Sequence, residues 1–165
     1  MNTISNNESK QINWSTLVML TLGFWLSGSL LLDSVIIPGL SASGMMSNGA
    51  AYVIFEIFNH IELLCGALVL TGFLVFSRHH NFTHQQEVWS IILSVLMLSI
   101  ALVYTYILTP QMGGLGLELN VFEPTTTMPA AMISLHKVYW VLEAIKLLAG
   151  VTLLNWCYRN ACRLG

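Results

Sequence analysis

Residues 51–76 read AYVIFEIFNHIELLCGALVLTGFLVF, an apolar run whose first half also carries Glu56, Asn59, His60 and Glu62. Crossing the hydrocarbon core of a bilayer takes about 20 mostly apolar residues in a helix, and this run is long enough. Ionisable side chains inside such a helix are costly, so they usually pair within the protein or serve a function. The stretch therefore predicts a transmembrane helix and raises the question of what its polar side chains contact.

The composition of the whole chain also points to a membrane protein. Its 165 residues are 55% hydrophobic and only 8% charged, and the mean hydropathy is +0.70. Soluble domains are about one quarter charged. Six Lys and Arg residues against eight Asp and Glu residues give no basic surface for nucleic acid. The lipid bilayer is therefore the partner that the composition predicts.

Four stretches of the chain are long and apolar enough to span a membrane. They cover approximately residues 14–37, 51–76, 88–108 and 132–157. Pro38-Gly39 and Thr109-Pro110 are expected to end the first and third helices, because proline interrupts helical hydrogen bonding. The predicted fold is an all-α integral membrane bundle of four transmembrane helices over residues 14–157. A polar N-terminal segment, 1–13, and a C-terminal tail, 158–165, flank it.

The distribution of basic residues predicts the orientation of the bundle. The loops 39–50 and 110–131 contain no Lys or Arg, whereas basic residues occur at the other ends of the spans: Lys10, Arg78, Arg159 and Arg163. Basic residues next to membrane spans favour the cytoplasmic side. Both termini are therefore predicted to be cytoplasmic. The protein is expected to be a multi-pass protein of the bacterial inner membrane, or of the thylakoid if the source is photosynthetic.

Several ionisable residues are predicted to lie at one depth in the outer half of the bilayer. With this orientation, the rise per residue of a helix places them near a common level: Asp33, Glu56, His60 and His136. The i, i+4 spacing of Glu56 and His60 puts both on one helix face, with Asn59 beside them. If this face looks into the bundle, Glu62 points elsewhere.

A second group of charged residues is predicted near the middle of the membrane. Lys146 follows Glu143 at the i, i+3 spacing that allows pairing, and Glu62 lies at a similar depth. Because an isolated charge at the bilayer centre costs at least about 2.5–3.5 kcal/mol, these residues are expected to form a structural ion pair, with Lys146 neutralising Glu62 or Glu143.

The same residues allow several functions. His60 and His136 are candidate ligands of haem b, chlorophyll or a divalent metal, and Asp33 and Glu56 could complete a metal site. A proton or ion path through these carboxylates is a further alternative, and a polar network that only holds the helices in register is another. The segment HHNFTH, residues 79–84, is expected to be solvated or at most a weak metal site. An enzyme is the least supported class, because no nucleophile or phosphate-binding motif is recognisable.

Motifs in each region of the chain resemble those of the DUF4149 family, bacterial four-helix membrane proteins that are similar to the TMEM205-like proteins. The matching segments comprise 57 of the 165 residues, about one third of the chain: LGFWLSGSLLLDSVIIP, FNHIELLCGALVL, YILTPQM and LHKVYWVLEAIKLLAGVTLL. Pro38, His60, Thr109-Pro110 and His136 match marks of that family. Family members usually carry basic residues after the Thr-Pro mark, where this chain has Gln111. The resemblance implies a four-helix membrane fold and no defined activity.

The favoured interpretation is a non-enzymatic membrane protein that serves as a small subunit or accessory factor of a larger membrane complex. Span 88–108 contains no charged residue and is expected to face lipid or other membrane subunits. The alternative is a protein that binds haem, chlorophyll or a metal, or that translocates an ion or proton, through His60 and His136.

Overall fold

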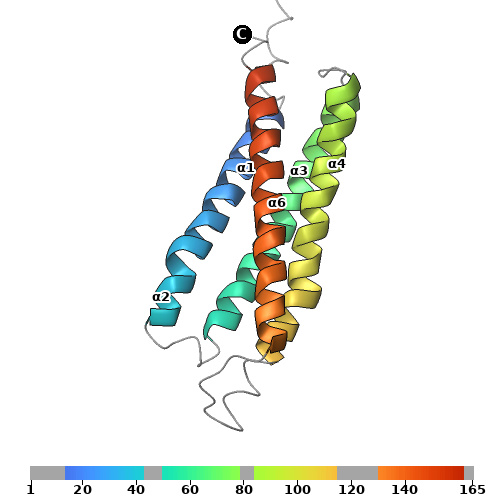
Figure 1. Cartoon of the computed structure of the whole chain (residues 1–165). Coiled ribbons are helices and arrows are strands. Elements are labelled where there is room, and N and C mark those ends of the chain that lie inside the picture. Colours follow the sequence, from blue (N-terminus) through green and yellow to red (C-terminus); the bar gives the residue numbers. More distant parts are fainter. Residues whose placement is uncertain (1–13, 43–49, 79–83, 115–129, 162–165) are drawn as a thin grey trace, which may run out of the picture.

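The computed structural model describes residues 14–42, 50–78, 84–114 and 130–161, and all of these residues are helical (Figure 1). The four helical rods are α1 (Trp14–Leu31) continued by α2 (Ile37–Ala42), α3 (Ala50–Arg78), α4 (His84–Val103) continued to Gly114, and α6 (Ala130–Ala161). Each contains a segment that is long and apolar enough to cross a membrane. The predicted fold class, an all-α membrane bundle of four spans, is confirmed.

The four rods form a bundle in which each helix packs against two neighbours. Helix α3 packs against α1 and α4, and α6 packs against the same two helices. Helices α3 and α6 therefore occupy diagonal corners, and Figure 1 shows them running in the same direction. Side chains from α3 and α6 can meet in the centre of the bundle, while their outer faces point in opposite directions.

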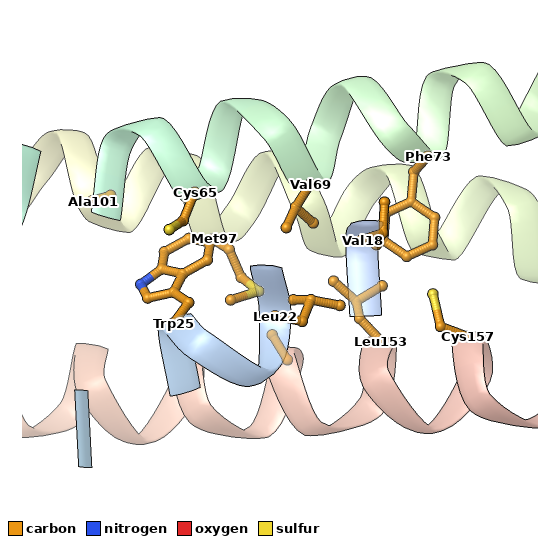
Figure 2. Packing of buried hydrophobic residues seen from close by; sticks show 11 residues of the cluster. Val18, Leu22, Trp25, Cys65, Val69, Phe73, Met97, Ala101, Leu153 and Cys157 are labelled. Carbon is orange, nitrogen blue, oxygen red and sulfur yellow. The ribbon is translucent and has the colours of Figure 1, made fainter. Parts of the chain in front are cut away.

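The core has a mainly apolar half and a half that contains the buried charged groups. Figure 2 shows the apolar half, in which side chains from all four rods interlock. Its buried residues are Val18, Leu22, Trp25, Cys65, Val69, Phe73, Met97, Ala101, Ala149, Leu153 and Cys157. The other half contains a smaller cluster around Tyr104 and Tyr139. In lipid, such helices associate through van der Waals packing and interhelical hydrogen bonds, because lipid tails are as apolar as the core.

Both proline motifs lie within helical rods, so the predicted helix ends at Pro38-Gly39 and Thr109-Pro110 are wrong. A π-helical turn precedes each proline: η2 (Leu32–Ile36) and η4 (Tyr104–Leu108). The amide of Ile37 bonds the carbonyl of Leu32, and that of Thr109 bonds the carbonyl of Tyr104, so both bonds span five residues. A proline ring normally collides with the carbonyl four residues earlier. We infer that the wider turn relieves this collision and lets the helix continue.

Glycines allow the closest helix contacts in the apolar half of the bundle. A Cβ atom at Gly72 of α3 would collide with the Val18 side chain of α1, and one at Gly66 would lie 3.3 Å from Trp25. In contrast, a Cβ atom at Gly23 would have no neighbour within 4 Å. Gly72 is therefore required by packing, whereas Gly23 is not.

This contrast gives a prediction for two alanine substitutions. Gly72→Ala is expected to lower the free energy of unfolding by about 1–3 kcal/mol, because the stiff Val18 side chain must move. Gly23→Ala is expected to be neutral or to stabilise by up to about 1 kcal/mol, because alanine favours the helix. Unfolding in mixed detergent micelles, followed by circular dichroism, measures both. Equal effects of the two substitutions would contradict the close approach of α1 and α3.

Candidate functional site

The centre of the bundle holds an ammonium group between two carboxylates. Lys146 Nζ lies 2.6 Å from Glu62 Oε1 across the bundle and 2.8 Å from Glu143 Oε2 on its own helix. All three side chains are at most 2% exposed. These are the residues for which the sequence predicts a structural ion pair, and the structure brings all three together. We call Glu62, Glu143 and Lys146 the buried triad.

Hydroxyl groups from the other two helices complete the surroundings of the buried triad. Ser29 Oγ of α1 donates a hydrogen bond of 3.0 Å to Glu62 Oε1. The Tyr104 hydroxyl of η4 lies 3.1 Å from Glu143 Oε2, to which it can donate, and 3.2 Å from the carbonyl oxygen of Tyr139. Lys146 Nζ also lies 5.1 Å from the centre of the Tyr104 ring. The site therefore joins all four rods.

A third carboxyl group lies beside the buried triad. The Tyr139 hydroxyl of α6 donates a hydrogen bond of 2.5 Å to Asp33 Oδ1. Asp33 is half-buried, and it interacts electrostatically with Glu62 and Lys146. Its position in the π turn η2 places it against α6. The structure thus links Asp33 of η2 to α6 through Tyr139.

The charges of the buried triad do not balance. Two carboxylates and one ammonium group carry a net charge of −1 when all three are ionised. In addition, Glu62 Oε2 and Glu143 Oε1 are buried and have no hydrogen-bond partner within the described residues. A cavity of about 10 Å³ is lined by all three triad residues, which is near the minimum size for one water molecule. A proton on one carboxyl group would neutralise the triad.

The polar residues of α3 divide differently from the prediction. Asn59 and Glu62 are buried, whereas Glu56 and His60 are exposed on the outer face of the helix. Asn59 Nδ2 donates a hydrogen bond of 2.6 Å to Thr109 Oγ1. Glu56 and His60 therefore share one face, as their spacing predicts, but this face is the outer one. The prediction that Asn59 lies on the same face is wrong. The inward stripe continues instead from Asn59 and Glu62 into the apolar core.

The two membrane histidines lie apart. The His60 Nδ1 atom lies 2.7 Å from the carbonyl oxygen of Glu56, so it must carry a proton to donate this bond. His136 is exposed on α6, and its Nε2 accepts a hydrogen bond of 3.0 Å from Trp140 Nε1. His60 belongs to the outer face of α3, which points away from α6.

The register between α3 and α6 also separates the histidines in depth. Glu62 contacts Lys146, and the Phe55 and Tyr139 rings meet edge to face with centroids 6.3 Å apart. Both contacts join residues 84 positions apart, so residue 144 of α6 lies at the level of His60. His136 lies eight residues before this level. At about 1.5 Å per residue, it is therefore about 12 Å nearer the end of the bundle at which α3 and α6 begin. The expectation of one common depth is wrong for this pair.

The predicted metal site is not assembled in the described part of the chain. Among these residues, no three His, Cys, Asp or Glu side chains are placed to hold a metal ion. Glu56 and His60 lie on the outside of α3, while Asp33 bonds Tyr139 inside the bundle. Haem or chlorophyll ligation by His60 or His136 stays a prediction. Lys10, His79, His80 and Cys162 lie outside the described residues, as do the side chains of Arg78 and His84.

Sequence reasoning missed three residues that contact the charged groups, namely Ser29, Tyr104 and Tyr139. Tyr139 was detectable, because it precedes Glu143 by four residues and Lys146 by seven and so shares their helix face. Ser29 and Tyr104 had no comparable signal. Their roles depend on how α1 and η4 pack against α3 and α6.

No protein-family model, curated protein or solved structure matches the chain. The resemblance to the DUF4149 family stays a prediction.

Proposed function

We propose that the protein binds and translocates a proton in the membrane, using the carboxyl groups around Lys146. In this proposal Glu62 and Glu143 share one proton at mid-membrane, and Asp33 exchanges protons with the aqueous side nearest to η2. Lys146 holds the remaining carboxylate and keeps the site assembled when the proton leaves.

The observation that carries this proposal is the surplus of carboxyl groups over ammonium groups in the buried triad. A purely structural ion pair needs one Glu for one Lys, and such a pair is neutral. Here a second Glu lies 2.8 Å from the same Nζ atom with its side chain 2% exposed. A net charge at the bilayer centre costs several kcal/mol, so binding of one proton is favourable. Either carboxyl group can carry this proton.

The position of Asp33 supports an exchange route with water. It is only half-buried and accepts a hydrogen bond from Tyr139. The Tyr139 carbonyl and Glu143 both lie within hydrogen-bonding distance of the Tyr104 hydroxyl. Two π turns contribute Asp33 and Tyr104, and π turns inside α-helices are frequent at functional sites. The polar groups therefore extend from Asp33 in η2 to Glu143 in the centre of the bundle.

Proton flux in reconstituted liposomes tests this function. Liposomes containing the protein and a trapped pH-sensitive dye are given a potassium gradient, and valinomycin then imposes a membrane potential. The wild-type protein is expected to conduct protons above the level of empty liposomes. Glu62→Gln and Glu143→Gln are expected to return the flux to that level, because an amide cannot exchange the proton.

Glu56→Gln is the matched control for this experiment. Glu56 is a carboxyl group on the same helix as Glu62, but it is exposed on the outer face. The Glu56→Gln variant is expected to conduct protons like the wild-type protein. Wild-type flux in both Glu62→Gln and Glu143→Gln would overturn the proposal.

The second candidate is the accessory role that the sequence favours, in which the protein is a small subunit of a larger membrane complex. Its support is the exposure of Glu56 and His60 inside a membrane span, since polar groups at this depth usually face protein or water. This candidate is compatible with proton binding, because the two use opposite faces of α3. Blue native electrophoresis of mild-detergent extracts tests it. Glu56→Leu and His60→Leu are expected to release the protein from its complex.

The orientation with cytoplasmic termini and the location in a bacterial inner membrane or thylakoid are part of the same proposal. Labelling of an engineered cysteine in place of Arg159, at the end of span Ile133–Arg159, tests the orientation. The proposal expects protection from membrane-impermeant thiol reagents in intact cells and labelling after lysis. Labelling before lysis would reverse the orientation.

A further inference from the structure

The outer face of α3 carries a regular stripe of exposed residues. Its six members are all exposed: Val53, Ile57, His60, Leu64, Ala67 and Thr71. They follow one another at intervals of four and three residues. This alternation is the spacing of the contact seam of a left-handed helix pair. We call these six residues the α3 outer stripe.

The outer face of α6 carries a stripe of the same spacing. Its six members are also exposed: Lys137, Val141, Ala144, Leu148, Val151 and Asn155. Leu148 is the most exposed apolar side chain of the two stripes, at 71%, and Leu64 of the α3 outer stripe follows at 68%. We call these residues the α6 outer stripe. Because α3 and α6 lie at diagonal corners, the two stripes face opposite sides of the bundle.

The two stripes are in register with each other. The Glu62–Lys146 and Phe55–Tyr139 contacts place residues 84 positions apart at one level. This difference is a whole number of seven-residue repeats, so each member of one stripe lies level with a member of the other. His60 is level with Ala144, and Thr71 is level with Asn155. If the two stripes of neighbouring molecules packed at this level, a large side chain would lie opposite a small one, and a hydroxyl group opposite an amide.

The polar side chains on these faces are complementary in charge. Glu56 is exposed beside the α3 outer stripe. The residue of α6 that is level with Glu56 is Trp140, and Lys137, the first member of the α6 outer stripe, lies about one helical turn from Trp140. Neither Glu56 nor Lys137 forms an ion pair within the described residues. Both charged residues lie four residues inside the same end of their spans. A lysine side chain can reach across one turn, so the two charges can pair between neighbouring molecules.

We propose that copies of this protein associate side by side in the membrane, with the α3 outer stripe of one copy packed against the α6 outer stripe of the next. The Glu56 carboxylate then pairs with Lys137 of the neighbour, and the Asn155 amide donates to the Thr71 hydroxyl, whose own proton is donated to Ala67. All copies keep one orientation in the bilayer, because α3 and α6 run in the same direction.

The arrangement is head-to-tail, since two different faces meet. Such contacts close into a ring if the rotation between neighbours allows it, and otherwise extend as a row. This inference does not depend on proton binding, because the buried triad lies on the opposite face of each helix. It assigns Glu56, His60, Thr71, Lys137 and Asn155 to contacts between identical subunits, so that the complex of the accessory role contains further copies of this chain.

Thiol crosslinking between differently tagged copies tests the proposal. Leu64→Cys is introduced in one copy and Leu148→Cys in the other, on a parent with Cys162→Ser, and both are co-expressed. These two positions are level with each other on the two stripes. A short thiol-to-thiol crosslinker is expected to join the tags when the two variants are mixed. Neither variant alone is expected to give a crosslinked product above the parent.

Charge reversal tests the polar contact in the same assay. Glu56→Lys in the Leu64→Cys copy is expected to weaken crosslinking about tenfold, equivalent to about 1.4 kcal/mol, because repulsion replaces attraction. Adding Lys137→Glu to the Leu148→Cys copy is expected to restore it. Thermal unfolding of each variant shows that the bundle itself is intact, since both positions are exposed.

Phe24→Cys is the control for random encounters in the membrane. Phe24 is 60% exposed on α1, outside both stripes, and its mixture with Leu148→Cys is expected to give no product above the parent. Crosslinking of Leu64→Cys copies with each other would indicate a symmetric interface and would overturn the proposal. A mixture of Leu64→Cys and Leu148→Cys that gives no more product than the parent would overturn it as well.

Discussion

Lys146→Met is expected to lower the free energy of unfolding by about 3–5 kcal/mol. Lys146 Nζ is the cation that contacts both Glu62 and Glu143, at 2.6 and 2.8 Å, and both carboxyl groups are buried. Removing one partner of a buried ion pair leaves an uncompensated charge, which is among the most destabilising single changes in a protein. Methionine preserves the length and much of the volume of the lysine stem, so the effect reports charge more than packing. Unfolding in mixed micelles measures it.

Two further variants separate the charge effect from other causes. Lys137→Met changes a lysine on the same helix that is exposed on the opposite face, and it is expected to change the stability of the monomer by less than about 1 kcal/mol. The triple variant Glu62→Gln, Glu143→Gln, Lys146→Met removes all three charges and is expected to regain most of the lost stability. A triple variant as unstable as Lys146→Met would show that charge is not the cause.

Tyr139→Phe is expected to lower the free energy of unfolding by about 1.5–3 kcal/mol. Its hydroxyl donates to Asp33 at 2.5 Å, and a hydrogen bond to a charged group contributes about this much. Loss of the hydroxyl leaves Asp33 without this donor at the boundary of the core. Tyr106→Phe is the matched control, because Tyr106 is 69% exposed in η4. It is expected to have an effect near zero.

A double-mutant cycle with Asp33→Asn isolates the contact between the two side chains. If Tyr139 acts mainly by stabilising the Asp33 carboxylate, Tyr139→Phe costs much less in the Asp33→Asn background. The same cycle run on proton flux in liposomes asks whether this hydrogen bond belongs to the exchange route. Additive costs in the stability cycle would contradict the pairing of Tyr139 with Asp33.

The spans were predictable because their signal is local. An apolar run of membrane-spanning length is recognised without knowing how the helices pack, and four such runs predicted four helices. The proline motifs misled the prediction of helix ends, because the π turns that accommodate Pro38 and Pro110 depend on hydrogen bonds over five residues. Proline is more frequent in transmembrane helices than in soluble ones for a related reason, since neighbouring groups satisfy the freed backbone.

The orientation of each helix face was less predictable, for a physical reason specific to membranes. In water, the buried stripe of a helix is the apolar one, whereas in lipid both the core and the outer face are apolar. Glu62 was correctly separated from Glu56 and His60 by the helical period, but the period alone does not say which face is inside. The answer comes from packing, where Gly66 and Val69 follow Glu62 on the side that meets α1 and α4.

The charged residues at mid-membrane were the most informative feature of the candidate site. Their cost in lipid made contact between Glu62, Glu143 and Lys146 expected from the sequence alone. The hydroxyl groups of Ser29 and Tyr104 could not be assigned, since serine and tyrosine are tolerated at many positions in membrane helices. Their roles follow only from the approach of four rods to one point in the structure.

Infrared spectroscopy tests most directly the claim that the buried triad holds a proton. A protonated carboxyl group has a carbonyl stretching band that a carboxylate lacks, and difference spectra between wild type and variants assign it. At neutral pH the protein in lipid bilayers is expected to show this band, and Glu62→Gln or Glu143→Gln to remove or shift it, while Glu56→Gln leaves it unchanged. Spectra in which neither Glu62→Gln nor Glu143→Gln alters any protonated-carboxyl band would contradict the account.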